Sequence, residues 1–374
     1  MKPLTESDFE QLENSNRSIE LIQRQYEFLV HGTAIRKEIS AATLGNGIQR
    51  LTSSQITEAI NNFIREKEHH TWMKFVPASG AASRMFAPFF TFQEAQSVAG
   101  FDFNSYCKSE EGHSIIKLFK ELKKLPFYAS TYARILQEDA ISLNNEIEFF
   151  EAFVSLVLSE KGLGYPSLPK ALIPFFVDEQ GKQWTAFEAQ LLEAFQLGQK
   201  HEAIPIHLTI DKEKRTAFEV AEANFRAKLT PDQIKDFTVD YSYQHPLTDT
   251  PFLNDQNEWV RDEEGKITFR KGGHGALLEN LNQLDADYIW IKNIDNILLT
   301  LANEEGEKWM QILAGHLLKV QKEIFYHLST LEQYKTETNF NEIINFIKLH
   351  FDPDYSLEES AKMPNEVLYD YLFR

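Results

Sequence analysis

The sequence predicts an α/β protein in which a mainly parallel sheet is flanked by helices. Short apolar stretches alternate with amphipathic segments from residue 171 to residue 294, which is the pattern of strands followed by covering helices. Hydrophobic residues make up 43% of the 374 positions and charged residues 25%, so the chain has enough apolar surface for a sizeable core. Before residue 70 and after residue 303 the pattern is helical, and we expect helical regions at both ends.

The first elements follow from their periodicity. Residues 7–29 and 53–70 are predicted to be helical, and in the second stretch Ile56, Ile60 and Phe63 fall on one face. Residues 72–78 form a short apolar run that predicts a buried strand. Helical periodicity returns over residues 88–163, which we interpret as a helical insertion.

Strands and helices then alternate along the chain. Thr185 and Glu188 form a capping box, S/T-x-x-E, that opens the first helix of this part. The expected elements are strand 171–177, the helix from residue 185, strand 203–210, helix 215–228, strand 237–243, a short strand near residue 267, a helix from residue 275 and strand 288–294. Helices are expected again after residue 303 and over 339–349.

This order predicts three regions. Residues 1–70 are expected to form a helical N-terminal extension, and residues 71–300 an α/β domain that carries the insertion 88–163. Residues 301–374 form a helical C-terminal region.

Charge and cysteine content restrict the function. The 38 Lys and Arg against 56 Asp and Glu give a net charge of −18, which excludes a basic nucleic-acid binder. The single cysteine, Cys107, excludes an internal disulfide and a thiolate metal cage. The polar, acidic start lacks a signal sequence and no apolar run is long enough to cross a bilayer, so we expect a cytoplasmic protein without a membrane partner.

The sharpest local signal is the segment KFVPASGAASRM at residues 74–85. Small side chains after a strand let backbone N–H groups approach a ligand, and ligands of open α/β sheets gather at the carboxyl ends of strands. Arg84 can then grip phosphate with its planar guanidinium group. The alternative is an ordinary tight turn with a surface arginine. The segment matches neither a Walker loop nor the GxGxxG pattern.

Two further segments carry candidate ligand-binding residues. The strand of YIWIKNIDNIL at residues 288–298 ends near Asp295, and a single carboxylate completed by phosphate oxygens and water is a usual way to hold Mg²⁺. Asp295 can equally be a helix N-cap or a turn residue. The segment RKGGHGALLENL at residues 270–281 places three glycines before a helix, and its alternative is a plain loop.

Taken in order, these motifs resemble the sugar-nucleotide pyrophosphorylases of the nucleotide-diphospho-sugar transferase superfamily, above all the UTP-dependent enzymes for UDP-N-acetylhexosamine and UDP-glucose. The family loop LAGGxGTRL or LAGGxGTRM keeps its frame here, with Ser79, Ala82 and Ser83 in place of Gly, Gly and Thr. The family segment PKxLLP matches residues 169–174, although some eighty residues separate it from the first loop. The pattern is also typical of a bacterial family attached to this superfamily.

The glycine-rich segment and the last strand complete the resemblance, which spans residues 74–299 without the insertion. Residues 273–281 align with GNGGLYxAL, with His274 for Asn and Ala276 for Gly, and residues 294–298 align with vDNxL. The resemblance implies a Rossmann-like sheet of the GT-A type and an enzyme that joins a nucleoside triphosphate, favouring UTP, to a sugar 1-phosphate. It assigns catalysis to Arg84 and Lys170 and Mg²⁺ binding to Asp295. The residues that it assigns to nucleotide binding are Ala78, Ser79, Gly80, Ala81, Ser83, Gln244, Gly273 and His274.

Two other functions remain open. A glycosyltransferase of the same architecture often uses a DxD metal motif, which Asp285 and Asp287 offer, but they precede their strand and so lie at the wrong edge of the sheet. The second alternative is a catalytically silent nucleotide-binding protein, favoured by the altered glycine loop and the long helical segments.

The sequence predicts that Arg84, Lys170 and Asp295 converge on one crevice.

Overall fold

The computed structural model describes residues 3–32, 41–138, 145–198, 203–229, 237–297, 304–333 and 337–351. Contacts divide the chain into two units. Unit 1 comprises Met1–Thr33 and Thr71–Asn303, and unit 2 comprises Ala34–His70 and Glu304–Arg374. This grouping separates residues 1–33 from residues 34–70, which the sequence predicts to form one extension.

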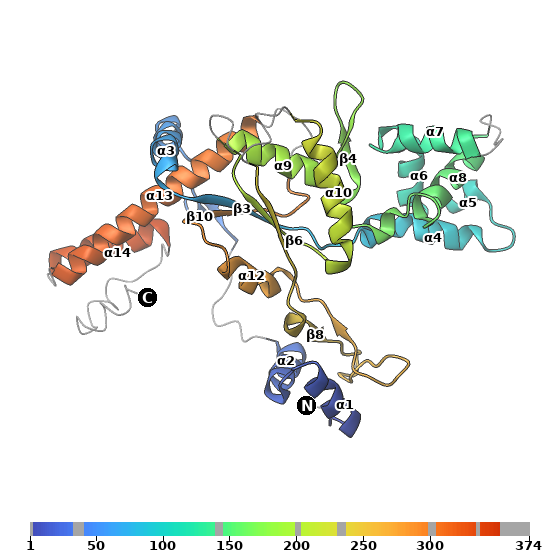
Figure 1. Ribbon diagram of the computed structural model, residues 1–374, viewed down its shortest axis with the longest axis horizontal. Coiled ribbons are helices and arrows are strands. Elements are labelled where there is room, and N and C mark those ends of the chain that lie inside the picture. The colour runs from blue at the N-terminus through green and yellow to red at the C-terminus, as the bar shows by residue number, and fades with distance from the viewer. Residues whose placement is uncertain are drawn as a thin grey trace. The chain divides into compact units, whose positions relative to one another are not determined.

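Unit 1 is an α/β structure built on a four-stranded parallel sheet with the strand order β10-β3-β6-β7 (Figure 1). The strands are β3 (Trp72–Pro77), β6 (Ile206–Thr209), β7 (Val239–Ser242) and β10 (Tyr288–Ile291). Their register pairs Trp72 with Tyr288 and Lys74 with Ile206. Because all four run the same way, their carboxyl ends lie along one edge, where ligands of open α/β sheets bind.

Side chains on the two faces of the sheet alternate as the strand period requires. Val76 and Leu208 are fully buried in a core shared with α9 (Ala186–Leu197) and α10 (Arg215–Arg226). Phe75 and His207, which alternate with them, stack at 5.9 Å between ring centroids on the other face. The central strand β3 is therefore buried almost throughout, and it holds the loop that follows it in a fixed position.

The predicted strand 171–177 lies outside this sheet, as does the short strand predicted near residue 267, which pairs as β9 (Phe269–Arg270) with β8 (Thr250–Pro251). The run at 171–177 is expected from the sequence to belong to the mainly parallel sheet, but β4 (Pro174–Val177) pairs antiparallel with β5 (Gln183–Thr185) in a separate hairpin. The reason is the turn between them. Asp178 accepts hydrogen bonds from the N–H groups of Gln180 and Lys182, and Gly181 has a φ of +82°, so the chain reverses at once.

The stretch predicted to be a helical insertion folds into short helices around a phenylalanine-rich core. Phe92 and Phe150 are fully buried, with ring centroids 5.3 Å apart. The elements are η2 (Ser83–Phe86), α4 (Ala87–Gln96), α5 (Phe103–Tyr106), α6 (His113–Glu121), η3 (Leu122–Lys124), α7 (Tyr128–Glu138), α8 (Glu146–Leu158) and η4 (Tyr165–Ser167), where η marks a 3-10 turn. Offset and edge-on ring packing of this kind supplies much of the stabilisation that a small helical core needs.

The N-terminal stretch, helical by periodicity over 7–29, is two helices, α1 (Glu6–Asn14) and α2 (Ile19–His31). Asn16 adopts a left-handed φ of 54° between them and Ser18 caps α2, so the helix breaks there. Both helices pack on an arm that contains β8 (Thr250–Pro251) and β9 (Phe269–Arg270). Arg261 of this arm binds Asp8 through two hydrogen bonds of 2.6 and 2.8 Å and lowers the pKa of that carboxyl to about 2.

The remaining short turns and helix of unit 1 connect these parts. They are η5 (Lys170–Leu172), η6 (Lys212–Lys214), η7 (Pro246–Thr248), η8 (His274–Leu277) and α12 (Leu278–Asn282). Asn280 of α12 donates hydrogen bonds to Ser242 and to the carbonyl of Tyr243, which ties α12 to the end of β7.

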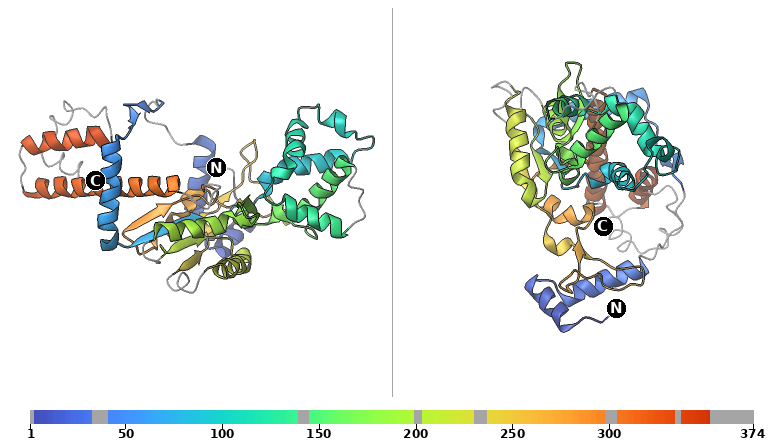
Figure 2. Two further views of the ribbon diagram at one scale, coloured as in Figure 1. Left: turned by 90° about the horizontal axis from the view of Figure 1, so that it is seen from above. Right: turned by 90° about the vertical axis from the view of Figure 1, so that its right-hand side faces the viewer.

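Unit 2 pairs α3 (Ser53–Glu66) with the long helix α13 (Glu304–Gln333), and the two helices cross steeply in Figure 2. It also contains β1 (Thr43–Leu44), β2 (Gly47–Ile48), the turn η1 (Lys67–His69) and α14 (Glu337–His350). Among the described helices, none combines the length and the apolar character needed to cross a bilayer.

Replacing Gly315 by alanine is expected to lower the free energy of unfolding by about 1–3 kcal/mol, the usual cost of overpacking. A Cβ atom at Gly315 would lie 1.8 Å from the carbonyl oxygen of Ala59, so α3 and α13 would have to separate. Urea unfolding followed by circular dichroism measures the loss. The control Leu313→Ala changes a side chain that is 65% exposed on the same helix and should alter stability far less; equal losses would contradict the explanation.

Candidate functional site

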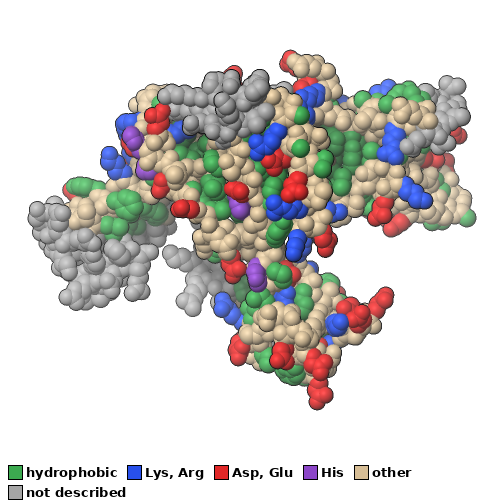
Figure 3. Space-filling view, in the orientation of Figure 1, with side chains coloured by type: hydrophobic (Ala, Val, Ile, Leu, Met, Phe, Trp, Pro, Cys, Tyr) green, Lys and Arg blue, Asp and Glu red, His purple; other side chains and the backbone are tan. Residues whose placement is uncertain are grey.

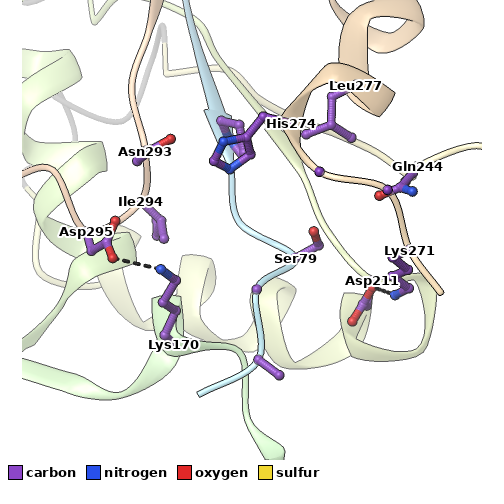
Figure 4. Close-up of a pocket in the computed structure, with 15 residues that line it drawn as sticks. Ser79, Lys170, Asp211, Gln244, Lys271, His274, Leu277, Asn293, Ile294 and Asp295 are labelled. Atoms are coloured by element: carbon purple, nitrogen blue, oxygen red, sulfur yellow. Dashed lines mark hydrogen bonds and ion pairs between the residues drawn. The ribbon is translucent and has the colours of Figure 1, made fainter. Parts of the chain in front are cut away.

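A cavity of about 590 Å³ opens at the carboxyl ends of the four parallel strands (Figure 4). It is lined by the loops that follow β3, β6, β7 and β10, by Lys170 of η5 and by the glycine-rich segment before α12. The lining residues are Pro77, Ser79, Gly80, Ala81, Lys170, Asp211, Gln244, Lys271, Gly272, Gly273, His274, Leu277, Asn293, Ile294 and Asp295. This is the position at which open α/β sheets bind their ligands.

The loop after β3 is held by the segment that carries Lys170. The N–H of Lys170 donates to the carbonyl of Gly80 at 3.0 Å, and the N–H of Ala82 donates to the carbonyl of Leu168 at 3.2 Å. A Cβ at Gly80 would lie 3.1 Å from Cε of Lys170, so the absence of a side chain lets the lysine cross the loop. This bridge joins segments some ninety residues apart and fixes the small-residue loop beside the lysine.

Three successive residues of this loop, Ser79, Gly80 and Ala81, line the cavity. Within the described part of the chain, the N–H groups of Ser79, Gly80 and Ala81 have no intramolecular acceptor. Consecutive N–H groups next to a lysine form a site that favours anions, and phosphate oxygens are their most frequent ligand. The loop therefore has the donors that the sequence predicts for it, although two of the family's glycines are replaced.

Lys170 and Asp295 form an ion pair at one side of the cavity. Nζ of Lys170 donates to Oδ2 of Asp295 at 2.7 Å, and the two side chains are 31% and 50% exposed. This hydrogen bond holds the pKa of Asp295 below its usual range, and the nearby His274 acts in the same direction. In Figure 4 the two side chains point toward one another, Asp295 from the loop after β10 and Lys170 from the segment below it. The carboxylate is thus ionised and partly open to water, as a metal-binding aspartate must be.

Helix α9 anchors the loop that carries Asp295. Nε2 of the fully buried Gln190 donates to the carbonyls of Asn293 and Ile294, at 3.0 and 3.1 Å. One turn further along α9, Glu193 binds Nζ of Lys292 through both carboxylate oxygens, at 3.0 and 2.7 Å. Backbone carbonyls and a side chain of one loop are therefore fixed by one helix, which positions Asp295 without touching it.

The other wall contains the glycine-rich segment. Gly272 packs against the turn η7, since a Cβ there would lie 2.8 Å from the carbonyl oxygen of Thr248. Nε2 of Gln244 donates to Oδ1 of Asp249 at 3.0 Å, which orients its amide at the cavity. Gly273 has open space around it. Of the three glycines, Gly272 is therefore the one whose small size the packing requires.

Comparison of the chain with known protein families identifies the family to which it belongs. A model described as "Domain of unknown function (DUF4301)" matches residues 5–373. The chain belongs to this family. Among solved structures, this DUF4301 chain is similar to a protein from Entamoeba histolytica described as a candidate UDP-N-acetylglucosamine pyrophosphorylase, with 13% identity and a TM-score of 0.37 over 73% of this chain and 50% of that one. The chain thus spans about half the length of that protein. No curated protein is a significant match.

Not every predicted site residue of the DUF4301 chain lines the cavity. Lys170, Asp295 and Gln244 line it, as do Ser79, Gly80, Ala81, Gly273 and His274. Ala78 is fully buried in the core next to the loop. Ser83 and Arg84 lie on η2, are exposed and are not among the lining residues. The predicted meeting of Lys170 and Asp295 is therefore found, whereas Arg84 lies outside the cavity lining.

The alternative DxD motif lies at the other end of the sheet. Oδ2 of Asp287 accepts hydrogen bonds from the N–H and hydroxyl of Thr71, at 2.8 and 3.0 Å, where β3 and β10 begin. These aspartates are remote from the carboxyl ends of the strands, as their order in the sequence predicts. Within the described residues, no group of three acidic, histidine or cysteine side chains is arranged to hold a metal ion.

Sequence reasoning missed an ion pair in the cavity. Asp211 lies two residues after the end of β6, and its carboxylate binds the ammonium group of Lys271 in the glycine-rich segment. Asp211 has the same signal that identified Asp295, a carboxylate just after a buried strand. Lys271 has a weaker signal, because only the glycines beside it suggested a ligand site.

Proposed function

We propose that this DUF4301 protein is a nucleotidyltransferase that joins a nucleoside triphosphate to a sugar 1-phosphate and releases pyrophosphate. The observation that carries the proposal is the Lys170–Asp295 pair beside three N–H groups that have no acceptor among the described residues, at the carboxyl ends of parallel strands. A cation, anion-binding backbone and an ionised carboxylate in one cavity are what the handling of a metal-bound polyphosphate requires. The order of motifs that resembles the UTP-dependent pyrophosphorylases favours uridine as the base.

In this reaction an oxygen of the sugar phosphate attacks the α-phosphorus and pyrophosphate leaves. Both substrates are anions, so positioning and charge stabilisation supply most of the acceleration. The N–H groups of residues 79–81 hold phosphate oxygens, and Lys170 stabilises the charge that develops at the reacting phosphate. Gln244 and Gly273 face the base, as the motif resemblance implies.

Asp295 is the proposed ligand of Mg²⁺. A lone carboxylate fits this ion, because Mg²⁺ keeps several waters and takes its other ligands from substrate phosphates. When bound, the ion neutralises phosphate charge that Lys170 alone does not balance. Releasing Asp295 to the metal also frees the ammonium group of Lys170 for phosphate.

Arg84 remains a proposed phosphate ligand at the outer end of the loop. Its side chain is exposed, and none of the described residues forms an ion pair with it. A free guanidinium group one turn beyond the loop can reach a terminal phosphate that projects from the cavity. We expect its loss to raise the KM for the nucleotide more than it lowers turnover.

The test is a panel of nucleoside triphosphates and sugar 1-phosphates assayed by pyrophosphate release. We expect release that requires Mg²⁺ and both substrates, with UTP the best nucleotide. Transfer to an acceptor with free nucleoside diphosphate and no pyrophosphate would instead indicate a glycosyltransferase. Binding of nucleotide without either product across the panel would indicate a silent binding protein.

A further inference from the structure

We propose that Lys271 and Asp211 form a second anion subsite of the cavity, which takes the phosphate monoester of the second substrate. This inference rests on the proposed function, because the second substrate is the sugar 1-phosphate of that reaction. The pair lies across the β3 loop from Lys170 and Asp295, with Ser79 between the two pairs in Figure 4. The cavity thus has one lysine–aspartate pair on each side of its small-residue loop.

The position of Lys271 is fixed by its neighbour. At Gly272 a Cβ would lie 2.8 Å from the carbonyl oxygen of Thr248 and 2.9 Å from Cβ of Ala276, so this backbone is closely packed. The ammonium group is also held by Asp211, which extends from the end of β6 in the central sheet. The Lys271 side chain is 59% exposed and that of Asp211 is 28% exposed, so the lysine is the accessible partner. Because the backbone beside Lys271 is closely packed, the base of this side chain loses little freedom when the ammonium group exchanges Asp211 for a ligand.

The charge balance of the cavity favours exchange of partners. Lys170 and Lys271 carry two positive charges, and Asp211 and Asp295 carry two negative charges. A phosphate monoester has a charge of about −1.5 to −2 and three acceptor oxygens, so it is a better partner for an ammonium group than a carboxylate with one charge. A neutral sugar without phosphate gains nothing from displacing Asp211. The pair therefore discriminates in favour of phosphorylated ligands.

Two separate cations suit a reaction between two anions. Like charges at close range repel, and each phosphate needs its own neutralising partner to approach the other. Lys170 with the 79–81 loop serves the polyphosphate, and Lys271 serves the incoming monoester. After Lys271 turns to the phosphate, the carboxylate of Asp211 is free to accept hydrogen bonds from sugar hydroxyl groups.

The distribution of charge in Figure 3 indicates that anionic ligands are attracted by individual side chains and not by the surface as a whole. On the face that this figure shows, the described acidic and basic side chains are interspersed, with no broad basic area among them. A protein with a net charge of −18 does not concentrate anions over its surface as a whole. Recognition of a phosphate then depends on individual lysines such as Lys271.

The experiment measures the binding of inorganic phosphate and glucose 1-phosphate to the full chain by calorimetry, in Lys271→Met, Asp211→Asn and the wild type. If the pair is an anion subsite, the two variants should change the affinity for phosphate in opposite directions. Lys271→Met should weaken binding of both probes about 10- to 100-fold, the scale of a lost hydrogen bond to a charged group. Asp211→Asn removes the competing carboxylate and should strengthen phosphate binding several-fold. Mg–UTP binding should change little in Lys271→Met.

If the ion pair only holds the two loops together, both variants should change phosphate binding equally, because both break the same ion pair. Equal effects of Lys271→Met and Asp211→Asn on phosphate binding, or no phosphate binding by the wild type, would overturn the proposal. The pyrophosphate-release panel is independent of this result. Opposite signs without pyrophosphate release would retain the subsite and reject the proposed reaction.

Discussion

Replacing Glu193 by glutamine is expected to lower the free energy of unfolding by about 3–5 kcal/mol, the cost of removing one partner from a buried charged group. Glu193 is 1% exposed and lies 2.6 Å from Nζ of Lys74 and 2.7 Å from Nζ of Lys292. Lys74 is fully buried in the central strand β3. Glutamine keeps the shape of the side chain but leaves two ammonium groups without a counter-charge.

The matched control is Lys74→Met. It leaves Glu193 paired with Lys292, so the cluster becomes neutral, and a buried ion pair replaced by an apolar side chain of similar size is often close to neutral in stability. We expect a loss of about 1 kcal/mol, from the hydrogen bond that Nζ of Lys74 donates to the carbonyl of Gln190 at 2.9 Å. Urea unfolding at neutral pH measures both. Similar losses in the two variants would contradict the charge argument.

The same cluster predicts a pH dependence. Burial lowers the pKa of Lys74 from 10.5 to about 8, with Glu193 opposing the shift and Lys292 adding to it. Between these two values the unfolded chain binds more protons at this lysine than the folded chain, so its contribution to stability rises with pH. In Glu193→Gln the opposing partner is gone and the pKa falls further. The stability deficit of that variant should therefore shrink as the pH is raised from 7 to 10.

How much of this could be predicted from the sequence depended on the range of the interactions involved. The ends of apolar runs locate the carboxyl edge of a parallel sheet, and this was enough to find Asp295. The partner of a buried charge is not local: Lys74 and Glu193 come from a strand and a helix more than a hundred residues apart. The apolar period of residues 72–78 therefore concealed a lysine whose burial depends on α9.

The hairpin of β4 shows a different limit. A four-residue apolar strand looks the same in a parallel sheet and in a hairpin, so the composition of residues 174–177 could not decide. The turn signal was present in Asp178 and Gly181, and it indicated immediate chain reversal. Cavity residues such as Lys271 were harder to predict from the sequence. The position of that lysine depends on the packing of Gly272 against a turn that the sequence does not specify.

Lys170→Met and Asp295→Asn are each expected to reduce turnover at least about 100-fold, the scale for a lost preorganised charge at a reaction centre. Both side chains are partly exposed, so neither change should unfold the protein. The pKa of Asp295 is held below its usual range by the hydrogen bond from Lys170, so the carboxylate is ionised at neutral pH. The loss in Asp295→Asn should therefore persist throughout the neutral range. Pyrophosphate release measures turnover, with Asp255→Asn as an exposed control outside the cavity.

A charge exchange separates chemistry from loop anchoring. In the double variant Lys170→Asp, Asp295→Lys, an ion pair can form again between the same positions, so a purely structural role predicts recovered turnover. A catalytic role predicts none, because the cation then extends from the loop after β10 and the carboxylate from the segment beside residues 79–81, where it repels the polyphosphate. We expect the double variant to remain folded by circular dichroism and at least as inactive as the single variants, with nucleotide binding weakened as well. Recovery of turnover to within a few-fold of the wild type would reject the assignment of Lys170 to phosphate and of Asp295 to the metal.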